Sequence, residues 1–133
     1  MGRTPAEILA SARTIALVGA SPRPERPSNS VMRYLLEHGY RMLPVRPGVE
    51  AIHGVPCVDR LADLEEPVDV VDVFRRAEFC PGVAGEAVAA GAGALWLQLG
   101  VVSPEARRIA EEAGLDYVED ECTAIVHRLL PAP

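Results

Sequence analysis

The chain of 133 residues contains no lysine, a single asparagine (Asn29) and a single glutamine (Gln98), so all 13 of its basic residues are arginine. Sparse amide side chains together with 12 prolines are compatible with a heat-adapted protein, although a GC-rich genome produces the same bias. The formal net charge of −6 argues against nucleic acid or an anionic membrane surface as a partner.

Long apolar runs are missing as well. No run approaches the roughly 18 residues of a membrane span, and the N-terminus lacks the apolar stretch and cleavage site of a secretory signal. Cys57, Cys80 and Cys122 form no CxxC pair, which disfavours a zinc site or a disulfide framework and favours three free thiols. We therefore expect a cytoplasmic protein, with one domain over residues 1–133.

What the sequence does contain is a regular alternation of continuous apolar runs and helical segments. The strands are apolar throughout rather than at every second residue, which is typical of a parallel sheet buried on both faces. This pattern predicts an α/β fold, a Rossmann-like doubly wound sheet of about five strands in a three-layer α/β/α arrangement, with the usual order 3-2-1-4-5. The expected strands are residues 14–18, 40–45, 68–74, 94–99 and 116–118.

Capping signals mark the expected helices. Thr4-Pro5-Ala6-Glu7 and Ser103-Pro104-Glu105 each place a capping residue before a proline in the first helical turn. Three helices are predicted at about 5–12, 80–90 and 122–130. A fourth begins with Ser28 or Asn29 as its capping residue and ends at Gly39, and a fifth lies between Ser103 and Gly114.

The loop after the first strand, within IALVGASPRPERPSNSV (residues 15–31), departs from the dinucleotide fingerprint. Gly19 fits the first position of G-x-G-x-x-G, but Ser21 and Pro24 occupy the positions of the next two glycines. A loop of this length would surround a phosphate with hydroxyl groups and arginines instead.

Basic residues follow three of the expected strands. Because parallel strands present their carboxyl ends at one edge, five arginines are expected around one crevice, with an acidic far edge after the fifth strand. Arg46 takes the place of the acidic residue that binds the ribose of NAD, and an arginine there suits a phosphorylated ribose, as in NADP or coenzyme A. The residues concerned are Arg23, Arg26, Arg46, Arg75 and Arg76 at the crevice and Glu119, Asp120 and Glu121 at the far edge.

No catalytic constellation can be identified. His38, His53 and His127 have no nucleophile at a recognisable spacing, and the serines fit loop or capping positions. No cluster of metal ligands is present in the sequence, so we expect neither catalysis nor a metal.

Several segments, in their order and spacing, resemble the CoA-binding domain family. They are IALVGAS with the loop to SNSV, LPVRPG, EEPVDVVDVFRRAEFC and WLQLGVVSPEARRIAEEAGLDYVEDEC, which together cover about residues 15–130. The chain is similar to the small stand-alone members and, more distantly, to the N-terminal domain of the succinyl-CoA synthetase alpha subunit. The synthetases carry a second domain with a phosphorylated histidine, and since these 133 residues include no such domain, we expect ligase chemistry to be absent.

The resemblance implies a protein that binds coenzyme A or acyl-CoA without catalysis, as a carrier, a sensor or a partner of an acyl-CoA enzyme. Two alternatives stay open: an NADP-dependent oxidoreductase fragment, and an interaction module with a vestigial nucleotide site. Oligomeric state and any reaction of Cys122 with the CoA thiol also stay open. By resemblance, the phosphates fall to Gly19, Ala20, Ser21, Ser28, Asn29 and Ser30 with Arg26 beside them, the adenosine end to Val45, Arg46 and Pro47, and the adenine and pantetheine side to Val73, Phe74, Arg75 and Phe79.

Overall fold

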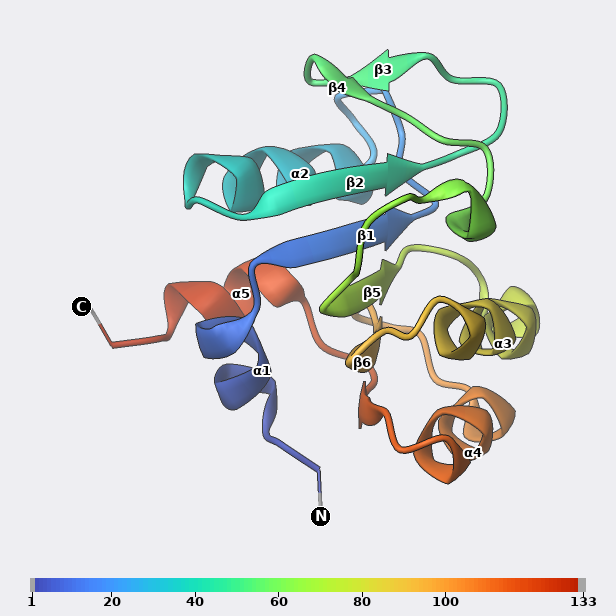
Figure 1. The fold of residues 1–133 in the computed structure, drawn as a ribbon. Helices are drawn as coiled ribbons and strands as arrows, with labels where there is room; N and C mark the ends of the chain where they lie inside the picture. The colour runs from blue at the N-terminus through green and yellow to red at the C-terminus, as the bar shows by residue number, and fades with distance from the viewer. Residues whose placement is uncertain (1, 132–133) are drawn as a thin grey trace.

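A five-stranded parallel sheet forms the centre of the computed structural model, which describes residues 2–131 (Figure 1). Helices α1, α2 and α5 cover one face of the sheet, and α3 and α4 cover the other. The predicted doubly wound α/β/α fold is therefore confirmed. The strands are β1 (Thr14–Val18), β2 (Arg41–Val45), β5 (Val70–Val73), β6 (Ala94–Leu97) and β7 (Asp116–Val118), and the helices are α1 (Pro5–Ser11), α2 (Pro27–Glu37), α3 (Cys80–Ala89), α4 (Pro104–Glu112) and α5 (Thr123–Arg128).

The strand order differs from the expected one. The sheet runs β2-β1-β5-β6-β7, which is 2-1-3-4-5 in chain order, so the expected order 3-2-1-4-5 is wrong. In this order the connections leave β1 toward one face and β5 toward the other, which puts the topological switch point between these two strands. The three strand ends followed by arginines nevertheless remain neighbours, with β1 in the middle.

Two of the predicted helix starts are found as expected. In α1 the Thr4 hydroxyl accepts from the Glu7 N–H at 3.2 Å, and the Glu7 carboxylate accepts from the Thr4 N–H at 2.8 Å. In α4 the Ser103 hydroxyl accepts from the Ala106 N–H at 3.1 Å. These side chains satisfy N–H groups that the first helical turn leaves without partners, which fixes where each helix begins.

The start of α2 was predicted wrongly. Neither Ser28 nor Asn29 caps it, because the helix already begins at Pro27, whose fixed φ and missing N–H suit the first helical position. Arg26 is the capping residue in extended conformation, and no described side chain makes a capping hydrogen bond there.

Several boundaries move inward, and one small sheet was not expected. Strands predicted over 40–45, 68–74 and 94–99 begin or end one to two residues earlier or later than expected, and the last helix is shorter than 122–130. The segment between β2 and β5 contains a short hairpin of β3 (Ala51–Ile52) and β4 (Val55–Pro56) and then the 3-10 turn η1 (Leu61–Asp63). A second 3-10 turn, η2 (Ala77–Phe79), follows β5. Among residues 2–131, no helix has the length and apolarity to cross a membrane.

Alternate residues of the central strands supply two apolar layers. On β5, Val71 and Val73 are buried among residues of α3 and α4, whereas Val70 is buried on the side of α1, α2 and α5. Trp96, on β6, is fully buried in this second layer. The continuous apolar strands seen in the sequence follow from this burial on both faces.

Gly19 marks the closest approach of β1 to β5. Its φ is +86°, and a Cβ at this position would lie 2.5 Å from the Phe74 carbonyl oxygen and 3.1 Å from Cγ of Arg75. Glycine is therefore required where the chain leaves β1, because it adopts the left-handed conformation and has no side chain to clash with Phe74.

We expect Gly19→Ala to destabilise the fold by at least about 3 kcal/mol, because the left-handed conformation and the clash with the backbone of Phe74 add together. Gly39→Ala is the matched control: its φ is +91°, but nothing lies within 4 Å of the added Cβ. The control should lose only about 1 kcal/mol. Urea unfolding measures both losses, and equal losses would contradict the close contact.

Candidate functional site

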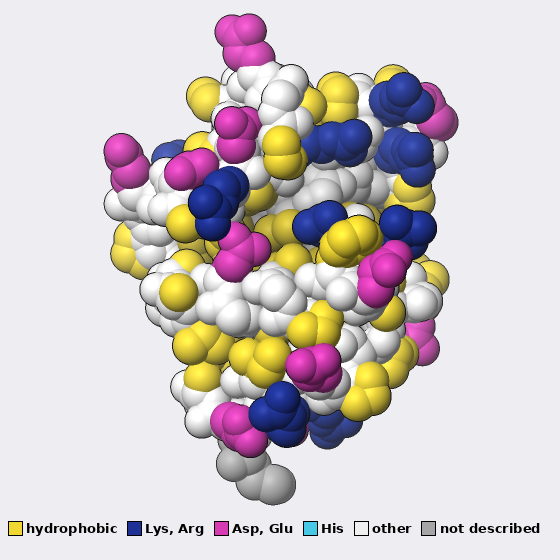
Figure 2. Space-filling view, turned by 90° about the vertical axis from the view of Figure 1, so that its right-hand side faces the viewer, with side chains coloured by type: hydrophobic (Ala, Val, Ile, Leu, Met, Phe, Trp, Pro, Cys, Tyr) yellow, Lys and Arg dark blue, Asp and Glu magenta, His cyan; other side chains and the backbone are white. Residues whose placement is uncertain are grey.

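Two adjoining pockets open at the carboxyl ends of β1, β2, β5 and β6, with volumes of about 580 and 560 Å³. Figure 2 looks onto this edge and shows a hollow with an apolar floor and basic side chains around its rim, all of which are arginines because the chain has no lysine. Both volumes suit a small organic ligand.

The first cavity, here called the arginine pocket, lies over the ends of β1, β2 and β5. Its lining residues are Val18, Gly19, Val45, Arg46, Pro47, Asp59, Arg60, Leu61, Phe74, Arg75, Arg76, Phe79 and Glu86.

The second cavity, here called the apolar pocket, extends from β1 toward β6 and α5. Five residues, Gly19, Arg46, Phe74, Arg75 and Arg76, line both pockets, so the two cavities meet above the switch point. The remaining lining residues are Ser21, Arg26, Pro27, Ser28, Val31, Gln98, Leu99, Val101, Cys122 and Ile125.

Hydrogen bonds hold the loop after β1 in place. The Asn29 side-chain amide donates to the Ser21 carbonyl at 2.9 Å, and both residues are buried. The Ser21 hydroxyl accepts from the Arg23 N–H at 3.1 Å. From the neighbouring strand, the Arg46 guanidinium donates to the Ala20 carbonyl at 3.2 Å, so this cation already lies against the loop.

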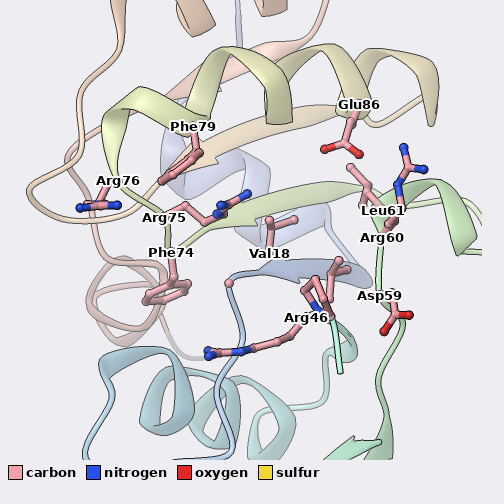
Figure 3. A pocket seen from close by; sticks show the side chains of 13 residues that line it. Val18, Arg46, Asp59, Arg60, Leu61, Phe74, Arg75, Arg76, Phe79 and Glu86 are labelled. Carbon is pink, nitrogen blue, oxygen red and sulfur yellow. The ribbon is translucent and has the colours of Figure 1, made fainter. Parts of the chain in front are cut away.

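Within the arginine pocket, two of the cations stand next to an aromatic ring, and two carboxylates also line the cavity. The Arg75 guanidinium lies 4.1 Å from the centre of the Phe79 ring, and that of Arg76 lies 5.5 Å from it. Figure 3 shows Phe74, Arg75, Arg76 and Phe79 at one end of the pocket, Asp59, Arg60, Leu61 and Glu86 at the other, and Val18 and Arg46 between them.

A buried polar network fixes the start of α5, which forms one wall of the apolar pocket. The Thr123 hydroxyl donates to Asp72 at 3.0 Å, and the Thr123 N–H donates to the Gln98 side-chain oxygen at 3.1 Å. Asp72 is fully buried in the middle of β5, and its second oxygen has no hydrogen-bond partner among the described residues. Burial raises the pKa of Asp72 to about 7 from its ordinary value of 3.8, although the bond from Thr123 acts in the opposite direction.

The structure places ten of the fourteen expected binding residues on the pocket walls and four elsewhere. Ala20 and Val73 are fully buried in the core layers, and Asn29 holds the loop through its side chain. Ser30 is exposed and donates to the Pro27 carbonyl at 3.2 Å. Those on the walls are Gly19, Ser21, Arg26, Ser28, Val45, Arg46, Pro47, Phe74, Arg75 and Phe79.

The expected ring of arginines also changes in one member. Arg23 is exposed and lines neither pocket, whereas Arg60, which the sequence analysis did not select, lines the arginine pocket. Arg60 precedes η1, and its backbone N–H is held by the Asp63 carboxylate at 3.1 Å.

Several pocket residues that sequence reasoning missed come from segments other than strand ends. Asp59 lies in the segment before η1, and Glu86 lies on α3, so both carboxylates reach the arginine pocket from outside the sheet. Leu99 and Ile125 were missed in the apolar pocket. Their only signal in the sequence is an apolar residue at a place where exposure is expected.

The histidines lie away from both pockets. His38 and His127 come within 5.1 Å of each other at the α2–α5 contact, where the Tyr34 hydroxyl is 2.8 Å from Nδ1 of His127. His53 contacts the Asn29 carbonyl at 2.9 Å. Within residues 2–131 no group of His, Cys, Asp or Glu side chains has the arrangement of a metal site.

Comparisons with known proteins give one family model and one curated relative that cover most of the chain. The model of the CoA binding domain matches residues 13–128. The uncharacterized protein YneT of Bacillus subtilis is 39% identical over 121 residues, which cover 91% of this chain and 90% of YneT.

Solved structures give the same result for the fold. A hypothetical protein from Pyrococcus horikoshii superposes with a TM-score of 0.92 at 39% identity, over 97% of this chain and 93% of the other. The fold is also shared with a dinucleotide-forming acetyl-coenzyme A synthetase from Candidatus Korarchaeum cryptofilum. The TM-score is 0.77 at 23% identity, over 86% of this chain and 27% of the synthetase chain.

The buried carboxyl of Asp72 generates a prediction about pH. Because its pKa is higher in the folded chain than in the unfolded one, Asp72 favours folding when it is protonated, and this contribution is lost as the pH rises from about 4 to 7. The stability of Asp72→Asn relative to that of the wild type should therefore rise by about 2 to 3 kcal/mol as the pH increases from 5 to 8. Urea unfolding across this range measures the difference, and parallel stability curves for the two proteins would contradict it.

Proposed function

This chain belongs to the CoA-binding domain family, and from that premise we propose that it binds coenzyme A across the two pockets at the carboxyl edge of its sheet. Membership of the family supports a CoA ligand in general. The observation that carries the proposal is the pairing of one cationic and one largely apolar pocket that meet at Gly19. Coenzyme A has the same division, with three phosphates toward its adenosine end and an uncharged pantetheine arm.

The arginine pocket suits the adenosine end. Arg46, Arg60 and Arg75 supply planar guanidinium groups, which pair well with phosphate oxygens. Phe79, together with the guanidinium stacked on it, offers a flat surface for an adenine ring. The carboxylates of Asp59 and Glu86 are acceptors for the adenine amino group or a ribose hydroxyl.

The diphosphate would lie between the two pockets, beside Gly19. No side chain at Gly19 blocks the approach of a ligand, and no described side chain caps the N-terminus of α2, whose positive dipole end attracts an anion. Arg26 and Ser28 stand at the start of this helix and line the apolar pocket. They supply a cation and a hydroxyl donor on the side where the pantetheine arm would begin.

The role proposed for the protein is binding without catalysis, as a carrier, a sensor or a partner of an acyl-CoA enzyme. None of the three histidines lines either pocket, and Cys122 is the only thiol that does. No histidine or carboxylate lines the apolar pocket beside Cys122, so no lining residue would act as the base that activates this thiol.

Calorimetric titration with CoA tests the proposal. We expect saturable binding of one CoA per chain, and absence of binding at millimolar CoA would refute it. NADPH serves as the comparison, because its 2′-phosphate could also use Arg46. A change in NADPH fluorescence at concentrations where CoA does not bind would favour the oxidoreductase alternative instead.

Arg46 allows a sharper test of the orientation. Arg46→Ala should weaken CoA binding by about tenfold or more, since a charge-assisted hydrogen bond contributes about 1.5–3 kcal/mol. The loss should be smaller for dephospho-CoA, which lacks the 3′-phosphate. Arg23→Ala is the matched control, because this exposed arginine of the same region lines neither pocket, and its affinities should stay within about twofold of the wild type. Equal losses for both ligands in Arg46→Ala would contradict the placement of the 3′-phosphate.

A further inference from the structure

The far end of the apolar pocket is lined by large apolar side chains that the described residues leave in water. Leu99 is 63% exposed and Ile125 is 47% exposed, and both line this pocket. Val101, also on its wall, is followed by Val102, which is 46% exposed. Single exposed apolar residues are common, but Leu99 and Val101 come from a different segment than Ile125 of α5, and all three line one cavity.

The charges of this pocket are confined to one end. Three of its four arginines also line the arginine pocket, and the fourth, Arg26, precedes α2. No aspartate or glutamate lines the cavity, and the lining residues near α5 include the uncharged side chains of Gln98, Leu99 and Ile125. The cavity therefore changes from cationic to apolar along its length.

The wall at this end is held in place before any ligand arrives. α5 is anchored by the bonds from Thr123 to Asp72 and to Gln98, and these partners lie on β5 and directly after β6. The Gln98 side-chain oxygen is used by this anchor, whereas no described residue accepts a hydrogen bond from its amide nitrogen. An amide donor is thus available at the apolar end of the cavity.

We propose that the ligand of this site is an acyl-CoA with a short or medium unbranched acyl chain, and that the chain lies on Leu99, Val101 and Ile125. The inference rests on the proposed CoA binding and adds the class of acyl group. A free CoA thiol would leave these apolar surfaces in contact with water, whereas an acyl chain removes them from it. The Gln98 amide is placed to donate to the thioester carbonyl or to an amide carbonyl of the pantetheine arm.

Calorimetry with CoA, acetyl-CoA, butyryl-CoA and hexanoyl-CoA tests this inference. The dissociation constant should fall by about two- to fourfold for each methylene that becomes buried. Leu99→Asn and Ile125→Asn should each reduce the ratio of hexanoyl-CoA to CoA affinity, and both side chains are exposed enough for the variants to fold. Leu129→Asn is the matched control: this leucine is 80% exposed, directly follows α5 and does not line the pocket, so the ratio should stay as in the wild type.

The outcomes separate the two proposals. If CoA binds but affinity does not rise with chain length, the acyl inference is overturned and the CoA site stands. If affinity rises with chain length as much in the Leu99 and Ile125 variants as in the wild type, the acyl group lies elsewhere, and the inference is also overturned. If no member of the series binds, the proposed function itself fails.

Discussion

The contact between Gly19 and the backbone of Phe74 is the constraint on which the rest of the site depends. It lies at the switch point, where the chain leaves β1 for one face of the sheet and β5 for the other. Because nothing projects from Gly19, the arginine pocket and the apolar pocket are continuous above it. A side chain at this position would push β1 away from β5 and stand where the two cavities meet.

A second constraint comes from a polar group in the core. Asp72 occupies a central strand, and within residues 2–131 its carboxyl makes one hydrogen bond, to Thr123 at the start of α5. Burying a carboxyl without a charged partner is unfavourable, and we attribute its presence here to its hydrogen bond with the start of α5. The bond fixes the helix start that forms the far wall of the apolar pocket, which links the protonation state of the core to the shape of the site.

The parts of the molecule that could be predicted from sequence are those encoded locally. Capping residues gave the starts of α1 and α4, because a side chain such as Ser103 satisfies N–H groups only a few residues away. Strand order could not be obtained in this way, since neither the apolar runs nor the turns specify whether the third strand pairs with the second strand or with β1. The same limit applies to the site: arginines at strand ends were found, whereas Arg60 and Glu86 reach the arginine pocket from a turn and a helix. Pro27 moved the start of α2 because its fixed φ and missing N–H suit the first helical position.

The central claim is that one ligand spans both pockets, with its charged end on the arginines and its uncharged end against α5. The most direct measurement is a crystal structure of the protein with CoA. The account predicts density for the diphosphate beside Gly19 and the start of α2, adenosine in the arginine pocket, and the pantetheine arm running past Gln98 toward Ile125. Adenosine in the apolar pocket, or CoA bound away from the carboxyl edge of the sheet, would contradict it.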